Sequence, residues 1–236
     1  DTAENYGDGR AERLVGEAIR PYDRAKLFLV SKVMPSNAYG TRLMTSLDRS
    51  LSHLGTDYLD LYLYHWRGGG TLAEVVEGME AARAVGKIRA WGVSNFDVAD
   101  MEELWRTPGG KNCLVNQVLY HMGSRGIDYS LLPWMREHGV ALMAYCPLAQ
   151  VGRLGCDLLG NAVLKRIAEK YGATPAQIAL AWAIRDGQTI AIPRTGRKAH
   201  ALLNAGADGI VLTAEDYAEI DRAFPPPTRK EPLHIE

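Results

Sequence analysis

The sequence has little cysteine, little net charge and no long apolar run. Only three cysteines occur among 236 residues, Cys113, Cys146 and Cys156, and they form no CxxC pair. An odd number of separated cysteines argues against a disulfide framework and favours a reducing compartment, so we expect a cytoplasmic protein. No run approaches the roughly 18 uninterrupted apolar residues that a membrane-spanning helix needs.

The charges nearly cancel, because 27 Lys and Arg stand against 28 Asp and Glu, a formal net charge of −1. Without a basic block, neither nucleic acid nor an anionic membrane is expected as the main partner. Hydrophobic residues make up 47% of the chain, which excludes a disordered protein. The length suffices for one large domain with a full core.

Six short runs are rich in β-branched, aromatic and aliphatic residues and predict strands. They are Lys26–Val33, Asp57–Trp66, Ile88–Asn95, Leu114–Tyr120, Val140–Leu148 and Thr189–Thr195. Most are nearly continuous in apolar character, as buried parallel strands are. The first five begin 26 to 31 residues apart, with helical patterns between them. This spacing predicts right-handed βαβ units and a parallel sheet.

Helices are predicted where apolar residues recur at helical spacing next to capping residues. They are Arg10–Arg20, Leu72–Val85, Val98–Trp105, Tyr129–His138, Asn161–Tyr171, Ala176–Arg185, Lys198–Asn204 and Thr213–Ala223. The clearest start is that of Ala176–Arg185, where Thr174 caps, Pro175 occupies the first helical position and Gln177 completes a capping box.

Two closures of the sheet compete, an open doubly wound sheet and a (β/α)8 TIM barrel. No GxGxxG follows the first strand, which weakens the dinucleotide-fold alternative. Polar residues stand at or near the ends of successive runs: Lys32, His65, Asn95, Gln117, Tyr145 and Arg194. A barrel assembles its active site at the carboxyl ends of its strands. We therefore expect an α/β protein of the (β/α)8 class.

Six strands are two fewer than a barrel needs. The segment Asp1–Tyr6 precedes a helix and would be the tip of a further strand. We expect the first strand, the first helix and most of the second strand to be absent from this sequence, roughly 40–50 residues by the usual proportions of a barrel. Residues 1–236 would then form a single barrel domain, destabilised and nearly inactive without that segment.

Seven short motifs, in order, resemble the aldo-keto reductase family. They are Asp1–Gly7, Ser31–Val33, Tyr64–Trp66, Gly92–Phe96, Asn116–Gln117, Ala144–Ala149 and Ile192–Thr195. Each motif alone is weak, but seven at barrel spacing are specific, and the resemblance extends to about Asn204. It implies an NADPH-dependent enzyme on a (β/α)8 barrel that reduces aldehydes or ketones to alcohols.

Residue types at the strand ends suit the same chemistry. Reduction of a carbonyl by hydride transfer needs a proton donor for the developing alkoxide. Tyr6 can serve if a neighbouring ammonium, Lys32, favours its phenolate, and Asp1 would keep a buried Lys32 charged. His65 can hydrogen-bond the substrate oxygen and fix its position. The resemblance implies these same four catalytic roles.

The resemblance also implies contacts to NADP(H). Those at the nicotinamide and pyrophosphate are Ser94, Asn95, Gln117, Tyr145, Cys146, Pro147 and Leu148, in a turn that continues to Gln150. Those at the adenosine end are Arg194, Thr195, His200 and Asn204. Arg194 suits a 2′-phosphate, which a guanidinium can bind bidentately. His200 stands where many members have arginine, which weakens the preference for NADPH, although Arg197 and Lys198 could compensate.

The substrate pocket is expected to be open. Trp66 and Met34 would form its walls, and the connection from Trp66 to Thr71 contains three glycines and leaves little loop to cover it. We therefore expect small carbonyl substrates, dicarbonyls among them. The protein would bind no metal, and it would be a monomer or a weak oligomer.

Three alternatives stay open at this point. A cofactor-binding regulatory subunit of the same fold, with low turnover, would keep the same four residues. An inactive truncated fragment would follow if the missing strands cannot be replaced. An aldolase that uses Lys32 as a Schiff base is the third.

Overall fold

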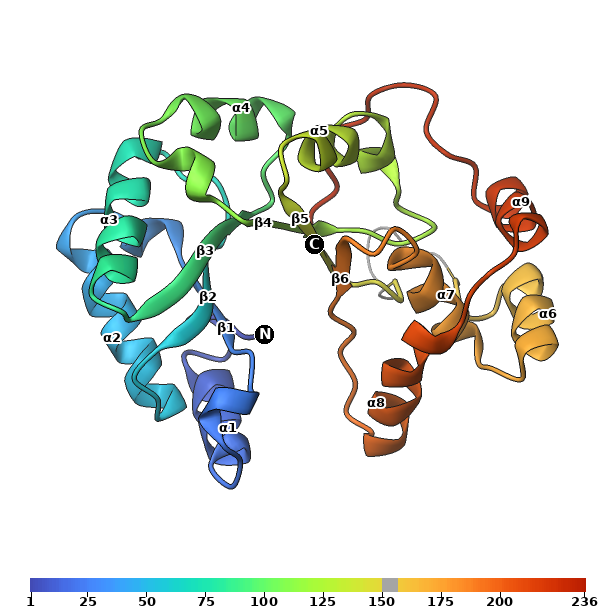
Figure 1. Ribbon diagram of the computed structural model, residues 1–236, viewed down its shortest axis with the longest axis horizontal. Coiled ribbons are helices and arrows are strands. Elements are labelled where there is room, and N and C mark those ends of the chain that lie inside the picture. Colours follow the sequence, from blue (N-terminus) through green and yellow to red (C-terminus); the bar gives the residue numbers. More distant parts are fainter. Residues whose placement is uncertain (150–156) are drawn as a thin grey trace. The chain divides into compact units, whose positions relative to one another are not determined.

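Each of the six apolar runs contains a strand (Figure 1). The strands are β1 (Val30–Val33), β2 (Leu59–Tyr64), β3 (Ile88–Ser94), β4 (Val115–Leu119), β5 (Ala141–Tyr145) and β6 (Thr189–Ala191). The computed structural model describes residues 1–149 and 157–236. It comprises two units, residues 1–116 and 117–236, and β4 begins in the first and ends in the second.

In the first unit, β1, β2 and β3 lie side by side in parallel. Lys32 pairs with Leu63, and Leu63 pairs with Gly92, so the polar ends of these strands reach the same edge. The side chains of β2 are buried on both faces apart from that of Asp60. This explains its nearly continuous apolar sequence.

Four helices complete the first unit. They are α1 (Arg10–Ile19), α2 (Thr41–Leu54), α3 (Leu72–Ala84) and α4 (Val98–Arg106). Helix α2 packs against β1 and α3 packs against β3, while α1 contacts α2 (Figure 1). Asp97 begins α4 with a capping box, as a short polar residue before an apolar run predicts.

Helix α2 was not among the predicted helices. Leu43, Leu47, Leu51 and Leu54 form its buried stripe, and Gly55 ends it with a φ of 65°. The buried face also carries Ser46 and Ser50. These hydroxyls interrupt the apolar pattern from which helices are predicted, which is why the sequence pattern was weak here.

In the second unit, β5 and β6 are parallel, with Leu142 paired with Thr189. The backbone N–H of Tyr120, just after β4, donates to the carbonyl of Tyr145 at 3.4 Å. The helices are α5 (Leu131–Glu137), α6 (Ala162–Tyr171), α7 (Pro175–Ala183), α8 (Lys198–Ala205) and α9 (Ala214–Ala223). The predicted start of α7 is confirmed, because Thr174 and Gln177 form a capping box.

All six strands are shorter than the runs that predicted them, the first and the last among them. The run from Lys26 begins with a turn of 3-10 helix, Arg24–Lys26, and becomes a strand only at Val30. The run from Thr189 ends at Ala191, close to Pro193, which has no N–H to donate to a neighbouring strand. The α/β class is nevertheless the one predicted, with parallel strand pairs and helices between strands.

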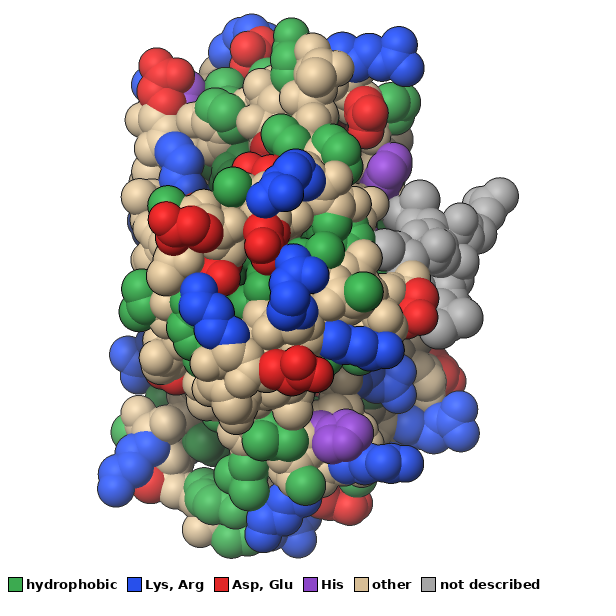
Figure 2. Space-filling model, turned by 90° about the vertical axis from the view of Figure 1, so that its right-hand side faces the viewer, with side chains coloured by type: hydrophobic (Ala, Val, Ile, Leu, Met, Phe, Trp, Pro, Cys, Tyr) green, Lys and Arg blue, Asp and Glu red, His purple; other side chains and the backbone are tan. Residues whose placement is uncertain are grey.

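The described surface carries both signs of charge. Over the face drawn in Figure 2, Lys and Arg side chains are interspersed with Asp and Glu, in keeping with a formal net charge of −1. No helix within residues 1–149 and 157–236 is long and apolar enough to span a membrane.

Candidate active site

Lys32 is the centre of a buried polar cluster in the first unit. Its side chain projects from β1 and is only 1% exposed. The ammonium donates to Asp1 Oδ1 at 2.5 Å, to the Thr2 carbonyl at 3.0 Å and to Tyr6 Oη at 3.3 Å. These three acceptors match its three N–H donors. Burial lowers the pKa of Lys32, and the neighbouring Tyr6 oxygen opposes that shift.

The segment before α1 brings Tyr6 to this lysine. It runs beside β1, because Thr2 N–H donates to Val30 and Glu4 N–H donates to Lys32. A turn then follows, in which Tyr6 N–H donates to the Ala3 carbonyl at 3.1 Å. The phenol is thereby carried back over Lys32 while the Tyr6 residue stays 41% exposed. The Tyr6 residue is thus both hydrogen-bonded to a buried ammonium and partly exposed to solvent.

His65 follows β2 and lies against Tyr6. The ring centroids are 5.7 Å apart in an edge-to-face arrangement, and His65 is 8% exposed. Burial, together with the charge of Lys32, lowers the pKa of His65 to about 4. The imidazole is therefore neutral near pH 7. Its Nδ1 is buried and has no hydrogen-bond partner among the described residues.

Trp66 and Met34, the predicted walls of a substrate pocket, directly follow His65 and β1 in the chain. The Trp66 ring is 4.6 Å from the His65 ring, centroid to centroid, and the residue is 36% exposed. Met34 follows β1, and its N–H donates to Glu4 Oε1 at 2.6 Å. Trp91, which is completely buried, belongs to the core instead.

Ser94 and Asn95 stand at the end of β3 in the same unit. Asn95 has a φ of 59°, in the left-handed region that asparagine tolerates better than most residues. Its Nδ2 donates to the His65 carbonyl at 3.3 Å and to Ser94 Oγ at 3.2 Å. The structure thus connects these two candidate cofactor residues to the strand that carries His65.

The second unit holds the other predicted cofactor residues. Gln117 is buried on β4, and its amide lies 2.7 Å from Met143 Sδ. Tyr145 is half-buried at the end of β5, and its hydroxyl accepts from the Glu236 N–H at 3.3 Å. In the following turn Ala149 N–H donates to Cys146, both with positive φ. Pro147 is buried and Leu148 half-buried in that turn; Gln150 lies outside the described residues.

The candidate residues for the adenosine end lie on the surface of this unit. Arg194 and His200 are exposed, and Thr195 and Asn204 are half-buried. Thr195 Oγ1 accepts from the Arg197 N–H at 3.1 Å, just before α8. No residue of α8, which is described over its whole length, is buried.

Glu4 and Tyr39 were not singled out in the sequence. Glu4 lies within the first motif, where no role was predicted for it, yet its side chain is buried. Tyr39 Oη lies 2.6 Å from Tyr64 Oη and accepts from the Gly70 N–H at 3.0 Å. Local patterns do not reveal these contacts, because the partners are 25 to 45 residues away in the sequence.

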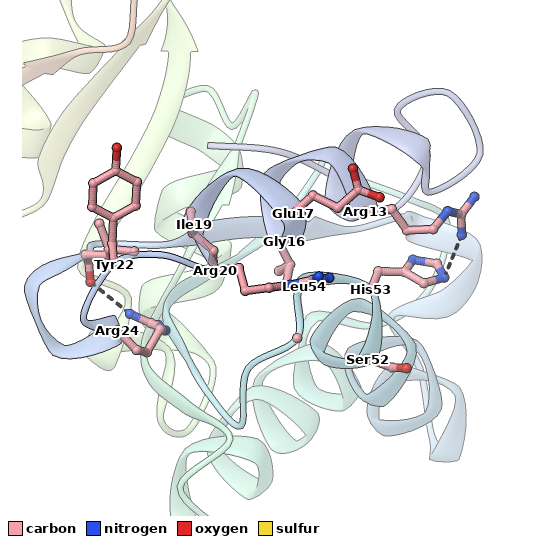
Figure 3. A pocket seen from close by; sticks show the side chains of 12 residues that line it. Arg13, Gly16, Glu17, Ile19, Arg20, Tyr22, Arg24, Ser52, His53 and Leu54 are labelled. Atoms are coloured by element: carbon pink, nitrogen blue, oxygen red, sulfur yellow. Dashed lines mark hydrogen bonds between the residues drawn. The ribbon is translucent and has the colours of Figure 1, made fainter.

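A separate cavity of about 460 Å³ lies between α1 and the end of α2 (Figure 3). Arg13, Arg20 and Glu17 line it, and Arg13 Nη1 lies 3.0 Å from His53 Nε2. Its lining residues do not include the Asp1–Tyr6–Lys32–His65 cluster. Within the part of the chain that the structure describes, no group of three or more His, Cys, Asp or Glu side chains could hold a metal ion.

The sequence and the fold are those of an oxidoreductase family. A model described as "Aldo/keto reductase family" matches residues 1–224, and the chain belongs to this family. "Methylglyoxal reductase YeaE" of Escherichia coli (strain K12) is 51% identical over 235 residues, which cover 100% of this chain and 82% of that protein. "Glyoxal reductase" of Bacillus subtilis (strain 168) is 35% identical, covering 94% of this chain and 76% of that protein.

A solved structure supports the same assignment. The aldo/keto reductase from Klebsiella pneumoniae, crystallised with NADP and acetate, superposes with a TM-score of 0.97 at 50% sequence identity. The match covers 100% of this chain and 83% of that chain.

Proposed function

We propose that this chain reduces small aldehydes and ketones, dicarbonyls such as methylglyoxal among them, by hydride transfer from NADPH. The observation that carries the proposal is the contact of Tyr6 Oη with Lys32 Nζ at 3.3 Å, with Asp1 on the same ammonium at 2.5 Å. The relatives named as reductases of methylglyoxal and glyoxal support the substrate class. The related structure with NADP supports the cofactor.

In this proposal Tyr6 gives its proton to the carbonyl oxygen. Loss of the proton leaves a phenolate, which the ammonium of Lys32 stabilises at hydrogen-bond distance. Asp1 and the Thr2 carbonyl keep that ammonium charged although the side chain is buried. The same three contacts disfavour an aldolase, because a protonated Schiff base keeps only one N–H and would lose at least two of these hydrogen bonds.

His65 would position the substrate. A neutral imidazole has one N–H donor and one acceptor nitrogen, so it can donate to a carbonyl oxygen without competing for the proton that Tyr6 transfers. Its ring lies against Tyr6, so a carbonyl bound to it is within reach of the phenol. Holding the carbonyl and the proton donor in the right geometry raises the rate of the reaction.

The residues present fit the cofactor. Ser94, Asn95 and Gln117 offer hydroxyl and amide groups, which supply the donors and acceptors that a nicotinamide carboxamide needs. The buried Nδ1 of His65 is a further polar atom, and it has no hydrogen-bond partner among the described residues. When bound, NADPH supplies the hydride. Arg194 would bind the 2′-phosphate of NADPH, and Tyr145 would stack on the nicotinamide ring.

The remaining expectations are proposals of the same kind. Trp66 beside a short glycine-rich connection favours small substrates. We propose that residues 1–236 form one (β/α)8 barrel domain of a cytoplasmic enzyme that is a monomer or a weak oligomer.

The test is the oxidation of NADPH with methylglyoxal as substrate, followed by absorbance. The proposal expects carbonyl-dependent oxidation with one alcohol formed for each NADPH consumed. NADPH binding without turnover would favour the regulatory subunit instead. A borohydride-trapped adduct on Lys32 would favour the aldolase, and either result would overturn the proposed function.

A further inference from the structure

Glu4 belongs to the turn that carries Tyr6, and its carboxylate is bound by groups outside that turn. Glu4 is 7% exposed, and its two oxygens accept from four groups. Oε1 accepts from the Met34 N–H at 2.6 Å and from Asn37 Nδ2 at 3.0 Å. Oε2 accepts from Arg49 Nη2 at 2.6 Å and from the Ser46 hydroxyl. Although burial opposes ionisation, these donors lower the pKa of Glu4, so the group is an anion at neutral pH.

The backbone N–H of Tyr6 closes this turn. The residue is 41% exposed, its hydroxyl accepts from Lys32 Nζ at 3.3 Å, and its ring lies edge-to-face with that of His65. The turn that holds it begins at Ala3, and Glu4 is the residue that follows. Asn5, the other inner residue of the turn, is exposed. Glu4 therefore supplies the buried polar anchor of this turn.

The donors to Glu4 all follow Lys32 in the sequence. Met34 and Asn37 follow Lys32 by two and five residues, and Ser46 and Arg49 belong to α2. One carboxylate thus joins the turn with Tyr6 to the chain just beyond β1 and to the helix that packs against β1. Glu4 therefore contacts segments that lie next to both partners of the Tyr6 Oη–Lys32 Nζ contact in the chain.

We infer that Glu4 is a positioning residue that holds the Tyr6 phenol at the Lys32 ammonium. It does so by binding the Met34–Asn37 segment and α2 through its buried carboxylate. The inference rests on the proposed function, since it concerns the proton donor of that reaction. It also connects the donor to one wall of the proposed pocket, because Met34 provides both the wall and an N–H to Glu4.

The test is Glu4→Gln, which keeps the size of the side chain and removes its charge and one acceptor. At least one of the four donors then faces an amide N–H. Misplacement of a reacting group by about 1 Å can cost about 100-fold in rate. We expect the single-turnover rate of methylglyoxal reduction to fall about 30- to 100-fold, with the Kd for NADPH within about threefold of wild type.

The matched control is Glu12→Gln. Glu12 is also fully buried, and its carboxylate accepts from Ser31 at 2.7 Å and lies 3.0 Å from His53 Nδ1, outside the turn. The single-turnover rate of Glu12→Gln should stay within about threefold of wild type, even if its melting temperature falls as much as that of Glu4→Gln. Large losses of rate depend on the geometry of the site, which this substitution leaves in place. If Glu4→Gln fails to fold, Ser46→Ala removes one donor and keeps the carboxylate, and a smaller fall of about fivefold is expected.

A second readout does not depend on turnover. In Glu4→Gln the amides of Met34 and Tyr6 should exchange hydrogen faster, while amides of β2 stay as protected as in wild type. A rate within threefold of wild type, an equal loss in both glutamine variants, or unchanged exchange at Met34 and Tyr6 would overturn the inference. If the wild-type protein shows no turnover, the proposed function fails, and the exchange measurement alone decides the role of Glu4.

Discussion

The candidate catalytic residues of the first unit and the candidate adenosine-site residues of the second are held in opposite ways. Lys32 and His65 are buried, and three hydrogen bonds fix the Lys32 ammonium before any ligand is present. Arg194 lies on the surface before α8, and His200 lies on α8 itself, a helix without buried residues. Proton transfer needs preset geometry. Recognition of a phosphate needs a charge that can reach it, and salt screens an exposed charge.

The largest effect is expected from Tyr6→Phe, which removes the proposed proton donor and keeps the ring. Turnover should fall by about two to four orders of magnitude, the range for general acid catalysis. NADPH should still bind, since the lost hydroxyl belongs to the chemical step. Steady-state oxidation of NADPH and a fluorescence titration measure the two quantities. Turnover within a few-fold of wild type would exclude Tyr6 as the donor.

A fall in pH should destabilise the folded protein, because two of its histidines are buried in the neutral form. Burial and Lys32 lower the pKa of His65 to about 4, and burial and His234 do the same for His121. In the unfolded chain each histidine binds its proton near pH 6.5. The stability from the neutral folded form is therefore fully present above pH 6.5 and is lost as the pH falls towards 4, at most about 3 kcal/mol for each histidine.

Urea unfolding at several pH values measures this loss. His65→Gln and His121→Gln should each flatten the dependence of the unfolding free energy between pH 6.5 and pH 4. A slope that stays as steep as that of wild type in both variants would contradict the burial of these two neutral imidazoles.

Arg194→Ala tests the surface half of the comparison. Loss of a hydrogen bond to a charged group costs about 1.5–3 kcal/mol, or about 10- to 150-fold in the Kd for NADPH. The Kd for NADH should change less than about twofold, because NADH carries no 2′-phosphate. The difference between the cofactors should shrink as salt is added. Equal weakening of both would show that Arg194 does not contact the phosphate.

The smallest effect concerns the loop after β2. A Cβ at Gly70 would lie 2.3 Å from the Tyr39 ring, whereas a Cβ at Gly69 meets nothing within 4 Å. Gly70→Ala should therefore destabilise the protein by about 1–3 kcal/mol, the usual cost of overpacking. Gly69→Ala should stay within about 0.5 kcal/mol of wild type. Equal melting temperatures would mean that the loop is not held by Tyr39.

Local sequence patterns predicted the elements that local forces build. The capping box of α7 depends on groups within four residues of one another, and it is present as expected. Helix α2 escaped prediction because its buried face includes Ser46, whose hydroxyl serves a carboxylate 42 residues earlier in the chain. A polar residue on a buried face breaks the apolar pattern, although in the folded protein its partner offsets the cost of burial.

The α/β class and the polar residues at the strand ends could be predicted from the sequence, because both follow from periodicity and from the order of motifs. The folded structure was needed to find that Tyr6 Oη lies 3.3 Å from Lys32 Nζ, that the pKa of His65 is lowered and that the Glu4 carboxylate accepts from the Met34 N–H. The physical reason is that these properties depend on strand register and burial. Both bring together groups that are about 30 residues apart, and no local pattern specifies the distance or the dielectric between them.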